Sequence, residues 1–344
     1  MQPNTDSPVL VTGASGYLAS HIIKILLERG FKVRGSVRSV SNLAKYQFLF
    51  DLVPEKKDNL TLVEAELTSK NGWLKAVEGC RYVFHLASPL PPSVPKDEND
   101  LIIPAVEGTL NVLEAAIQGG AKKVIVTSSC LTITVGLAPG QVATEEDWSK
   151  EEFCSAYPKS KVRAEKAAWD FYENNKDKIE ITTVLPSLVF GPIYTQHGNA
   201  SEITIAEIMR GNYPGVMDIT FSVVDVRDVA EAHFQAMFTE GTAGKRYICA
   251  GHVVPFEDVF KVLKGDLEQY GYKINDKHIT AEEAVASGNA VAQRNVPLIG
   301  KKLPVNNEKS KRELGMTYLP FDQTIKDTAR SLIRHGVVEN KLTQ

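Results

Sequence analysis

The sequence predicts an α/β fold in which helices cover both faces of a doubly wound parallel sheet, followed by a smaller, partly interleaved C-terminal substrate lobe. Over residues 1–190, short apolar runs alternate with helical patterns, and connections of this length imply right-handed crossovers between parallel strands. The expected strands are continuous apolar runs, such as 124–126, which is typical of strands buried on both faces. At 344 residues, the chain can form one large domain or a core with a second lobe.

The expected core begins with a strand at residues 9–12 and a helix at 18–29, which Gly30 ends. A helical stretch is expected at 43–52, and further helices separate the later strands. These strands are expected at residues 31–37, 60–67, 82–86, 123–128 and 179–189.

Beyond residue 190 the alternation loosens, which predicts a substrate-binding lobe over residues 191–344, with parts of 220–250 returning to the core. One more strand is expected at 246–250. Helices are expected at residues 202–210, 226–237, 255–270, 308–314 and 322–335.

A glycine-rich turn links the first strand to the first helix. Gly13 allows the tight turn, Gly16 lets the backbone approach a phosphate, and the small Ala19 permits close packing of helix and sheet. A dinucleotide pyrophosphate would rest on the helix N-terminus, where free N–H groups and the helix dipole favour an anion. Three further cofactor contacts are expected in this segment, from Ser15, Tyr17 and Leu18.

The end of the second expected strand bears on the choice of cofactor. An NAD enzyme usually has an acidic residue there, bonded to the ribose 2′-hydroxyl, but residues 33–39 contain none. Arg38 can offer a planar fork of donors to a 2′-phosphate, and Lys45 can add charge. We therefore expect NADPH rather than NADH; a solvated surface arginine is the alternative interpretation.

Tyr157 and Lys161 are four residues apart, so a helix places them on one face. Because an ammonium group and the positive nicotinamide both favour the phenolate, we expect the pKa of Tyr157 to be lowered from about 10. Ser129 follows an expected strand and would hydrogen-bond the substrate oxygen; we favour it over Ser128. These three residue types form a proton-transfer set suited to a carbonyl or an alcohol.

A Tyr-x-x-x-Lys pair can also arise by chance in a chain with eleven tyrosines. A second pair, Tyr172 and Lys176, lies where the helical pattern breaks, and we assign it to the surface. Tyr157 instead opens its helix, with Pro158 tolerated in the first turn.

The motifs in series resemble those of extended short-chain dehydrogenases/reductases, a Rossmann-type superfamily. Within it, the chain is similar to the branch of dihydroflavonol reductases, cinnamoyl-CoA reductases and fungal methylglyoxal (aldehyde) reductases. The resemblance covers nearly the whole chain and rests on Thr-Gly-Ala-Ser-Gly-Tyr-Leu-Ala at 12–19, Val-Arg-Ser at 37–39, Val-Phe-His-Leu-Ala-Ser-Pro at 83–89, Glu-Gly-Thr-Leu-Asn-Val at 107–112, Val-Thr-Ser-Ser at 126–129, Tyr-Pro-Lys-Ser-Lys at 157–161, Leu-Pro-Ser-Leu-Val-Phe-Gly-Pro at 185–192, Val-Asp-Val-Arg-Asp-Val-Ala at 224–230 and Lys-Arg-Glu-Leu-Gly at 311–315.

The resemblance implies further roles. Ala87 would contact the cofactor, Asn111 would be structural, and Arg38 would bind the 2′-phosphate. Two departures stand out: Glu66 occupies a position that is usually Asp, and residues 153–157 lack the signature of cinnamoyl-CoA reductases, which argues against a CoA thioester substrate. The remaining implied contacts are Glu66 and Leu67 at the adenine, and Pro186, Ser187 and Val189 at the nicotinamide amide.

These observations predict an NADPH-dependent carbonyl reductase that converts an aldehyde or ketone to the alcohol, with Tyr157 as proton donor. Dihydroflavonol 4-reductase-like activity is an alternative. A sugar-nucleotide epimerase or dehydratase would bind NAD, and the missing acidic residue after the second strand argues against it. An NADP-sensing regulator would not need the Tyr157–Lys161 pair, which is intact. The substrate wall is expected from residues 89–95, 131–136 and 193–203, where His197 is the one titratable group.

The composition of the chain limits which classes of binding partner we expect. A net charge of −3 and a pI near 6.2 give no reason to expect a nucleic-acid partner, and no apolar run is long enough to suggest a membrane span. The four cysteines form no Cys-x-x-Cys pair, so we expect reduced thiols and no metal site. With no signal-peptide pattern at the start, a cytoplasmic protein is expected, either a monomer or a homodimer.

Overall fold

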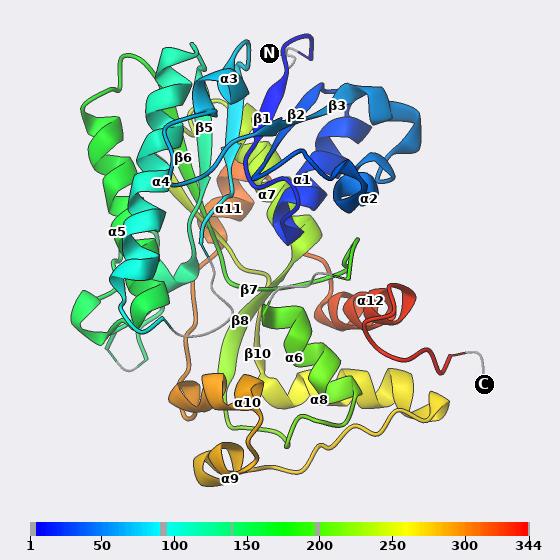
Figure 1. The fold of residues 1–344 in the computed structure, drawn as a ribbon. Coiled ribbons are helices and arrows are strands. Elements are labelled where there is room, and N and C mark those ends of the chain that lie inside the picture. Colours follow the sequence, from blue (N-terminus) through cyan, green and yellow to red (C-terminus); the bar gives the residue numbers. More distant parts are fainter. Residues whose placement is uncertain (1–4, 90–94, 139, 197–199, 343–344) are drawn as a thin grey trace.

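The computed structural model describes residues 5–89, 95–138, 140–196 and 200–342, and its centre is a seven-stranded parallel sheet (Figure 1). The expected Rossmann-type fold is thereby confirmed. The strand order reverses between β1 and β4, which is the topological switch point where ligands bind in such sheets. In sheet order the strands are β3 (Leu60–Glu64), β2 (Val33–Val37), β1 (Val9–Val11), β4 (Tyr82–His85), β5 (Lys123–Thr127), β6 (Glu180–Pro186) and β9 (Lys245–Cys249).

Helices cover both faces of this sheet, which is why its strands are apolar on both sides. On one face, α1 (Tyr17–Glu28) and α7 (Val226–Phe238) share an apolar core with β1 and β2. On the other face, α3 (Trp73–Val77), α4 (Asn99–Gln118) and α5 (Ala156–Glu173) build a second core (Figure 1).

The expected sixth strand, residues 179–189, is two strands in two different sheets. β6 ends at Pro186, which pairs with Cys249 of β9, and β7 (Leu188–Phe190) starts after Ser187 and pairs with β8. Pro186 has no N–H group to extend the first ladder, so the chain can leave it there. The apolar run continues through both strands, and its pattern therefore hides the change of sheet.

The second sheet, ordered β10-β8-β7, was not predicted. Its additional strands are β8 (Thr220–Asp225) and β10 (His252–Pro255), which pair antiparallel. An apolar core of its own lies between this sheet and α6 (Ala200–Met209), α8 (Phe256–Leu267) and α12 (Phe321–Arg334), in the lower half of Figure 1. After β7 and β8 of the second sheet, α7 packs on the seven-stranded sheet and β9 joins that sheet, before the chain returns to the second sheet in β10. The chain therefore passes between the two regions more than once. The division into lobes at residue 190 stays a prediction.

Shorter helices complete the chain. The expected helix at 43–52 is split into a 3-10 turn and one turn of α-helix, and α9 and α10 were not predicted. Among the described residues, no helix is long and apolar enough to cross a membrane. The remaining bounds are η1 (Leu43–Tyr46), α2 (Gln47–Phe50), η2 (Pro54–Asn59), η3 (Cys130–Thr132), η4 (Glu151–Phe153), η5 (Glu268–Tyr270), α9 (Ala281–Ala286), α10 (Ala290–Asn295), η6 (Val296–Leu298) and α11 (Glu308–Leu314).

Two helical glycines provide a test of the packing. A Cβ atom at Gly108 of α4 would lie 2.3 Å from Leu67 Cγ, whereas one at Gly265 of α8 would meet nothing within 4 Å. We expect Gly108→Ala to lower the free energy of unfolding by about 1–3 kcal/mol through overpacking. Gly265→Ala should raise it by about 0.5–1 kcal/mol, because it removes only the helix penalty of glycine. Urea unfolding of both variants measures the difference, and equal effects of one sign would contradict the packing of α4.

Candidate active site

The candidate site lies at the carboxyl ends of β1, β4, β5 and β6, beside the switch point of the sheet. Parallel pairing brings these ends to one edge, where α1 and α5 also begin. Segments far apart in the sequence therefore meet there.

The glycine-rich turn has the geometry of an anion site. Gly13 has a φ of 65°, which favours glycine, and a Cβ atom there would lie 3.3 Å from the Ala87 Cα atom. The cap of α1 is Gly16, so no side chain bonds to the N–H groups of the first turn. Ser15 is exposed, and α1 begins with Tyr17 and Leu18. Such free N–H groups fit a pyrophosphate.

A buried hydrogen-bond cluster joins this turn to the end of β4. Thr12 Oγ1 accepts from the N–H groups of Leu86 and Ala87, both at 2.9 Å, and lies 3.1 Å from His85 Nδ1. His85 Nε2 lies 3.3 Å from Thr109 Oγ1 on α4. Burial lowers the pKa of His85 to about 3, so the ring is neutral near pH 7. The resemblance implied that residues 85–89 line the cofactor, with Ala87 in contact, but it did not predict these hydrogen bonds of His85 with Thr12 and Thr109.

The residues expected at the adenine end lie after β2 and β3. Arg38 and Lys45 are exposed, and Arg38 has no hydrogen bond or ion pair within the described part of the chain, so its guanidinium is available to an anion. Glu66 accepts a hydrogen bond from the N–H of Leu67 at 2.9 Å. The side chain of Asn111 donates to the Leu67 carbonyl at 3.1 Å, a structural role as expected.

On the other side of the crevice, α5 carries Tyr157 in its first turn and Lys161 one turn later. Lys161 Nζ is buried and lies 3.5 Å from the Thr127 carbonyl at the end of β5. Ser128 is buried and donates to Glu165 at 2.5 Å, so its hydroxyl proton is already used. Ser129 Oγ accepts from Leu131 N at 3.1 Å and keeps its own proton to donate. This difference supports Ser129 as the substrate contact.

Burial changes the proton affinities of the pair in opposite directions. The pKa of Lys161 falls to about 8 through burial, which the carboxylate of Glu165 partly offsets. Burial raises the pKa of Tyr157 to about 12, and no neighbouring charge opposes it. We expected a lowered pKa of Tyr157 from the sequence; that expectation counted the ammonium and overlooked the desolvation of the phenol.

The turn between β6 and β7 contributes polar groups at the carboxyl end of β6, the strand beside β5. Ser187 donates its N–H to Cys249 at 3.0 Å, while its buried hydroxyl has no partner among the described residues. Such an orphaned hydroxyl fits a ligand amide, the partner expected of it. Pro186 is buried, and Val189 of β7 is half-buried.

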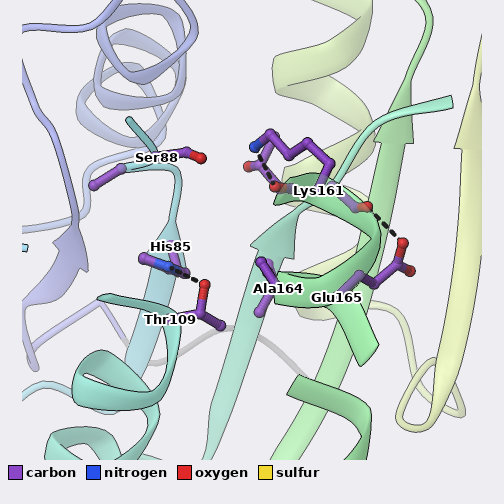
Figure 2. A pocket seen from close by; sticks show the side chains of 10 residues that line it. His85, Ser88, Thr109, Lys161, Ala164 and Glu165 are labelled. Atoms are coloured by element: carbon purple, nitrogen blue, oxygen red, sulfur yellow. Dashed lines mark hydrogen bonds between the residues drawn. The ribbon is translucent and has the colours of Figure 1, made fainter. Parts of the chain in front are cut away.

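A pocket opens between β4 and α5. Figure 2 shows His85 and Ser88 on one side, and Lys161, Ala164 and Glu165 projecting from α5 on the other. The main chain at the end of β5 forms its floor. The full lining consists of His85, Ala87, Ser88, Thr109, Val126, Thr127, Ser128, Lys161, Ala164 and Glu165.

Several predicted residues lie outside this arrangement. His197 and residues 90–94 of the expected wall are not among the described residues. Lys176, of the second Tyr-x-x-x-Lys pair, is 53% exposed and bonded to Glu173, which fits the surface assignment, whereas Tyr172 is half-buried against an apolar core. In the described ranges, no group of His, Cys, Asp and Glu side chains could hold a metal ion.

Sequence reasoning also missed Glu202, a buried carboxylate on α6 within the expected wall. Burial and this carboxylate raise the pKa of Tyr17 well above its usual value, which places the two side chains close together. One acidic residue in an apolar helix carries no recognisable signal.

Comparisons with known proteins find reductases that are similar to this chain. Cinnamoyl-CoA reductase 1 of Petunia hybrida is 33% identical over 95% of this chain and 92% of its own length. Dihydroflavonol 4-reductase of Arabidopsis thaliana is 35% identical, over 76% and 70% of the two chains. Among solved structures, yeast methylglyoxal/isovaleraldehyde reductase Gre2, complexed with NADPH, superposes with a TM-score of 0.79. It is 28% identical, and the match covers 96% of this chain and 99% of that one.

The sequence profile of the NAD dependent epimerase/dehydratase family matches residues 9–250, from the first strand through β9. The glycine-rich turn, the parallel sheet and the Tyr157–Lys161 helix all lie within that range. The chain therefore belongs to the NAD dependent epimerase/dehydratase family, as an extended short-chain dehydrogenase/reductase with reductases among its relatives.

Proposed function

We propose that this protein is an NADPH-dependent carbonyl reductase that converts an aldehyde or ketone into the alcohol. The observation that carries the proposal is the pocket between β4 and α5, where Lys161 is buried next to the end of β5, together with the uncapped N-terminus of α1 at the same edge of the sheet. One side of the crevice suits a dinucleotide, and the other carries a proton donor.

NADPH would supply the hydride, and this chain's residues would bind it and manage the proton. Gly13, Gly16 and the first turn of α1 would hold the pyrophosphate. Arg38, with Lys45 nearby, would contact the 2′-phosphate. Glu66, Leu67 and Ala87 would line the adenosine half, and Pro186, Ser187 and Val189 the nicotinamide amide.

The proton-transfer set would then act on the substrate oxygen. Ser129 donates a hydrogen bond that fixes the carbonyl, and Tyr157 donates the proton that completes the alcohol. A phenol with a raised pKa is protonated near pH 7, which is the form that a reduction requires. Lys161 holds a ribose hydroxyl and lowers the cost of charge on the tyrosine oxygen as the proton leaves.

The relatives bear on the substrate class. Those named above act on a cinnamoyl-CoA thioester, a dihydroflavonol and small aldehydes, respectively. Residues 153–157 lack the cinnamoyl-CoA reductase signature, so we favour a simple aldehyde or ketone, with a dihydroflavonol as the alternative. The solved UDP-glucose 4-epimerase of Thermotoga maritima is 20% identical and shares the fold alone.

Tyr157→Phe removes the proposed proton donor and should lower kcat about 10²–10⁴-fold, because a positioned acid contributes that much. The readout is NADPH oxidation at 340 nm against aliphatic, aromatic and dicarbonyl compounds and a dihydroflavonol. Tyr172→Phe, in the second Tyr-x-x-x-Lys pair on the same helix, is the matched control and should retain kcat. Full activity of Tyr157→Phe would refute the assignment; NADPH binding without any turnover of the wild type would favour the sensor.

Arg38→Gln should weaken NADPH binding about 10–100-fold and leave NADH binding nearly unchanged, because a charge-assisted contact to the 2′-phosphate is lost. Fluorescence titration with both cofactors measures the change. Arg312→Gln, on α11 at the opposite edge of the sheet, serves as the control and should alter neither affinity. Equal weakening for NADPH and NADH would show that Arg38 does not contact the 2′-phosphate.

The rate of reduction should fall as the pH rises through about 8, where Lys161 loses its proton. The sign follows from the lowered pKa: the ammonium is present below that value and is absent above it. A pH profile of kcat at saturating NADPH tests this, with carbonyl substrate in excess. A rate that is flat from pH 6 to pH 10 would exclude a need for charged Lys161.

A further inference from the structure

A buried ion pair lies directly behind the proposed catalytic set. Glu165, one turn after Lys161 on α5, is bonded to Arg246 of β9 at 2.9 and 3.2 Å. The side chains are 1% and 9% exposed, respectively. Two charges taken out of water in this way are costly unless further hydrogen bonds satisfy them.

The carboxylate of Glu165 faces the catalytic side. It accepts the hydroxyl of Ser128 at 2.5 Å and that of Thr183 on β6 at 2.9 Å. Ser128 immediately precedes Ser129, the proposed substrate contact. Glu165 therefore fixes the turn from which Ser129 projects, and Figure 2 shows its bond to this turn beside Lys161.

The guanidinium of Arg246 faces the other way, toward the expected substrate wall. It donates to the carbonyls of Glu145 and Asp147 at 2.7 Å each, and lies 3.9 Å from the ring centroid of Trp148. Ser149, next in this segment, accepts from Val135 N and donates to the Leu131 carbonyl, both at 2.8 Å. Ser149 thus holds residues 131–136 against the 145–149 segment, and Arg246 holds that segment in place.

We propose that Glu165 is a positioning residue of the reductase. Together with Arg246, it fixes the positions of the Ser129 turn, the Lys161 helix and the 131–136 wall relative to one another. The proposal rests on the proposed function for its kinetic consequence. This arrangement holds the substrate carbonyl between its proton donor and the wall. A small displacement of the carbonyl from that position lowers the rate strongly.

The same carboxylate supports the charge on Lys161, because it opposes the lowering of that residue's pKa by burial. Besides Tyr157 on α5, which burial keeps protonated, the charged or titratable groups around the two side chains are Arg246 on β9, Glu145 in the 145–149 segment, Cys130 on η3 and His85 on β4. Cys130 and His85 are held neutral by burial, and Arg246 is paired with Glu165. Glu165 is therefore the carboxylate whose loss should move the titration of Lys161 downward.

Two variants separate positioning from a merely structural role. Ser128→Ala removes only the hydroxyl between Glu165 and the Ser129 turn and leaves the ion pair intact. The double variant Glu165→Gln/Arg246→Met removes both charges together, so that neither is left buried alone. Lys123→Met is the control, because Lys123 is a buried cation at the opposite end of β5, bonded to Thr242 at 2.6 Å.

We expect Ser128→Ala and the double variant to lower kcat by about 10–100-fold, the effect of misplaced reacting groups, with NADPH affinity at pH 6 little changed. The titration midpoint of Lys161, followed by NMR through its 13Cε resonance and assigned with Lys161→Arg, should fall below the wild-type value in the double variant. Lys123→Met should lower the melting temperature and leave both quantities unchanged.

Wild-type kcat in Ser128→Ala, or a wild-type Lys161 midpoint in a folded double variant, would overturn the proposal and leave the pair a structural one. If the double variant does not fold, Ser128→Ala alone decides. If the wild type reduces no carbonyl, the proposed function fails, and the Lys161 midpoint still tests the link to Glu165.

Discussion

The rest of the structure depends on one constraint: parallel strands end at the same edge of a sheet. The chain must cross back after every strand, and each crossing delivers another loop and another helix start to that edge. The glycine turn after β1, the Thr12–His85 cluster after β4 and the Ser128–Ser129 turn after β5 are neighbours for this reason alone. The topology of the sheet therefore fixes where the site lies, whichever side chains the loops carry.

Burial is the second determinant, and it affects the two members of the catalytic pair differently. A phenol that is taken out of water keeps its proton, whereas an ammonium in the same place tends to lose its proton. Glu165 offsets the second tendency at the expense of its own desolvation, which Arg246 and the hydroxyls of Ser128 and Thr183 relieve. A neutral phenol and a charged ammonium can therefore both be buried here, because the Glu165 carboxylate, itself paired with Arg246, opposes the loss of the ammonium proton.

Much of the core was predictable, since a strand buried on both faces and a helix with one apolar face each leave a strong pattern. The helix that carries Tyr157 and Lys161 could be predicted, because residues four apart lie on one face of a helix. The second sheet could not: β10 has only four residues, and the apolar run through β6 and β7 gives no sign of where the ladder changes. Glu165 and Arg246 are 81 residues apart, and no local pattern links them. The raised pKa of Tyr157 depends on packing from several elements, which spacing alone does not reveal.

The second sheet and its helices have an apolar core of their own, separate from the two cores that flank the seven-stranded parallel sheet. Substitutions on α8 therefore change the packing of this core, whereas substitutions on α6 can also reach Tyr17 at the start of α1 through Glu202. In evolutionary terms, the molecule is modular without being divided into consecutive halves. Descendants of such a chain can diverge in what they reduce while the reducing half stays constant.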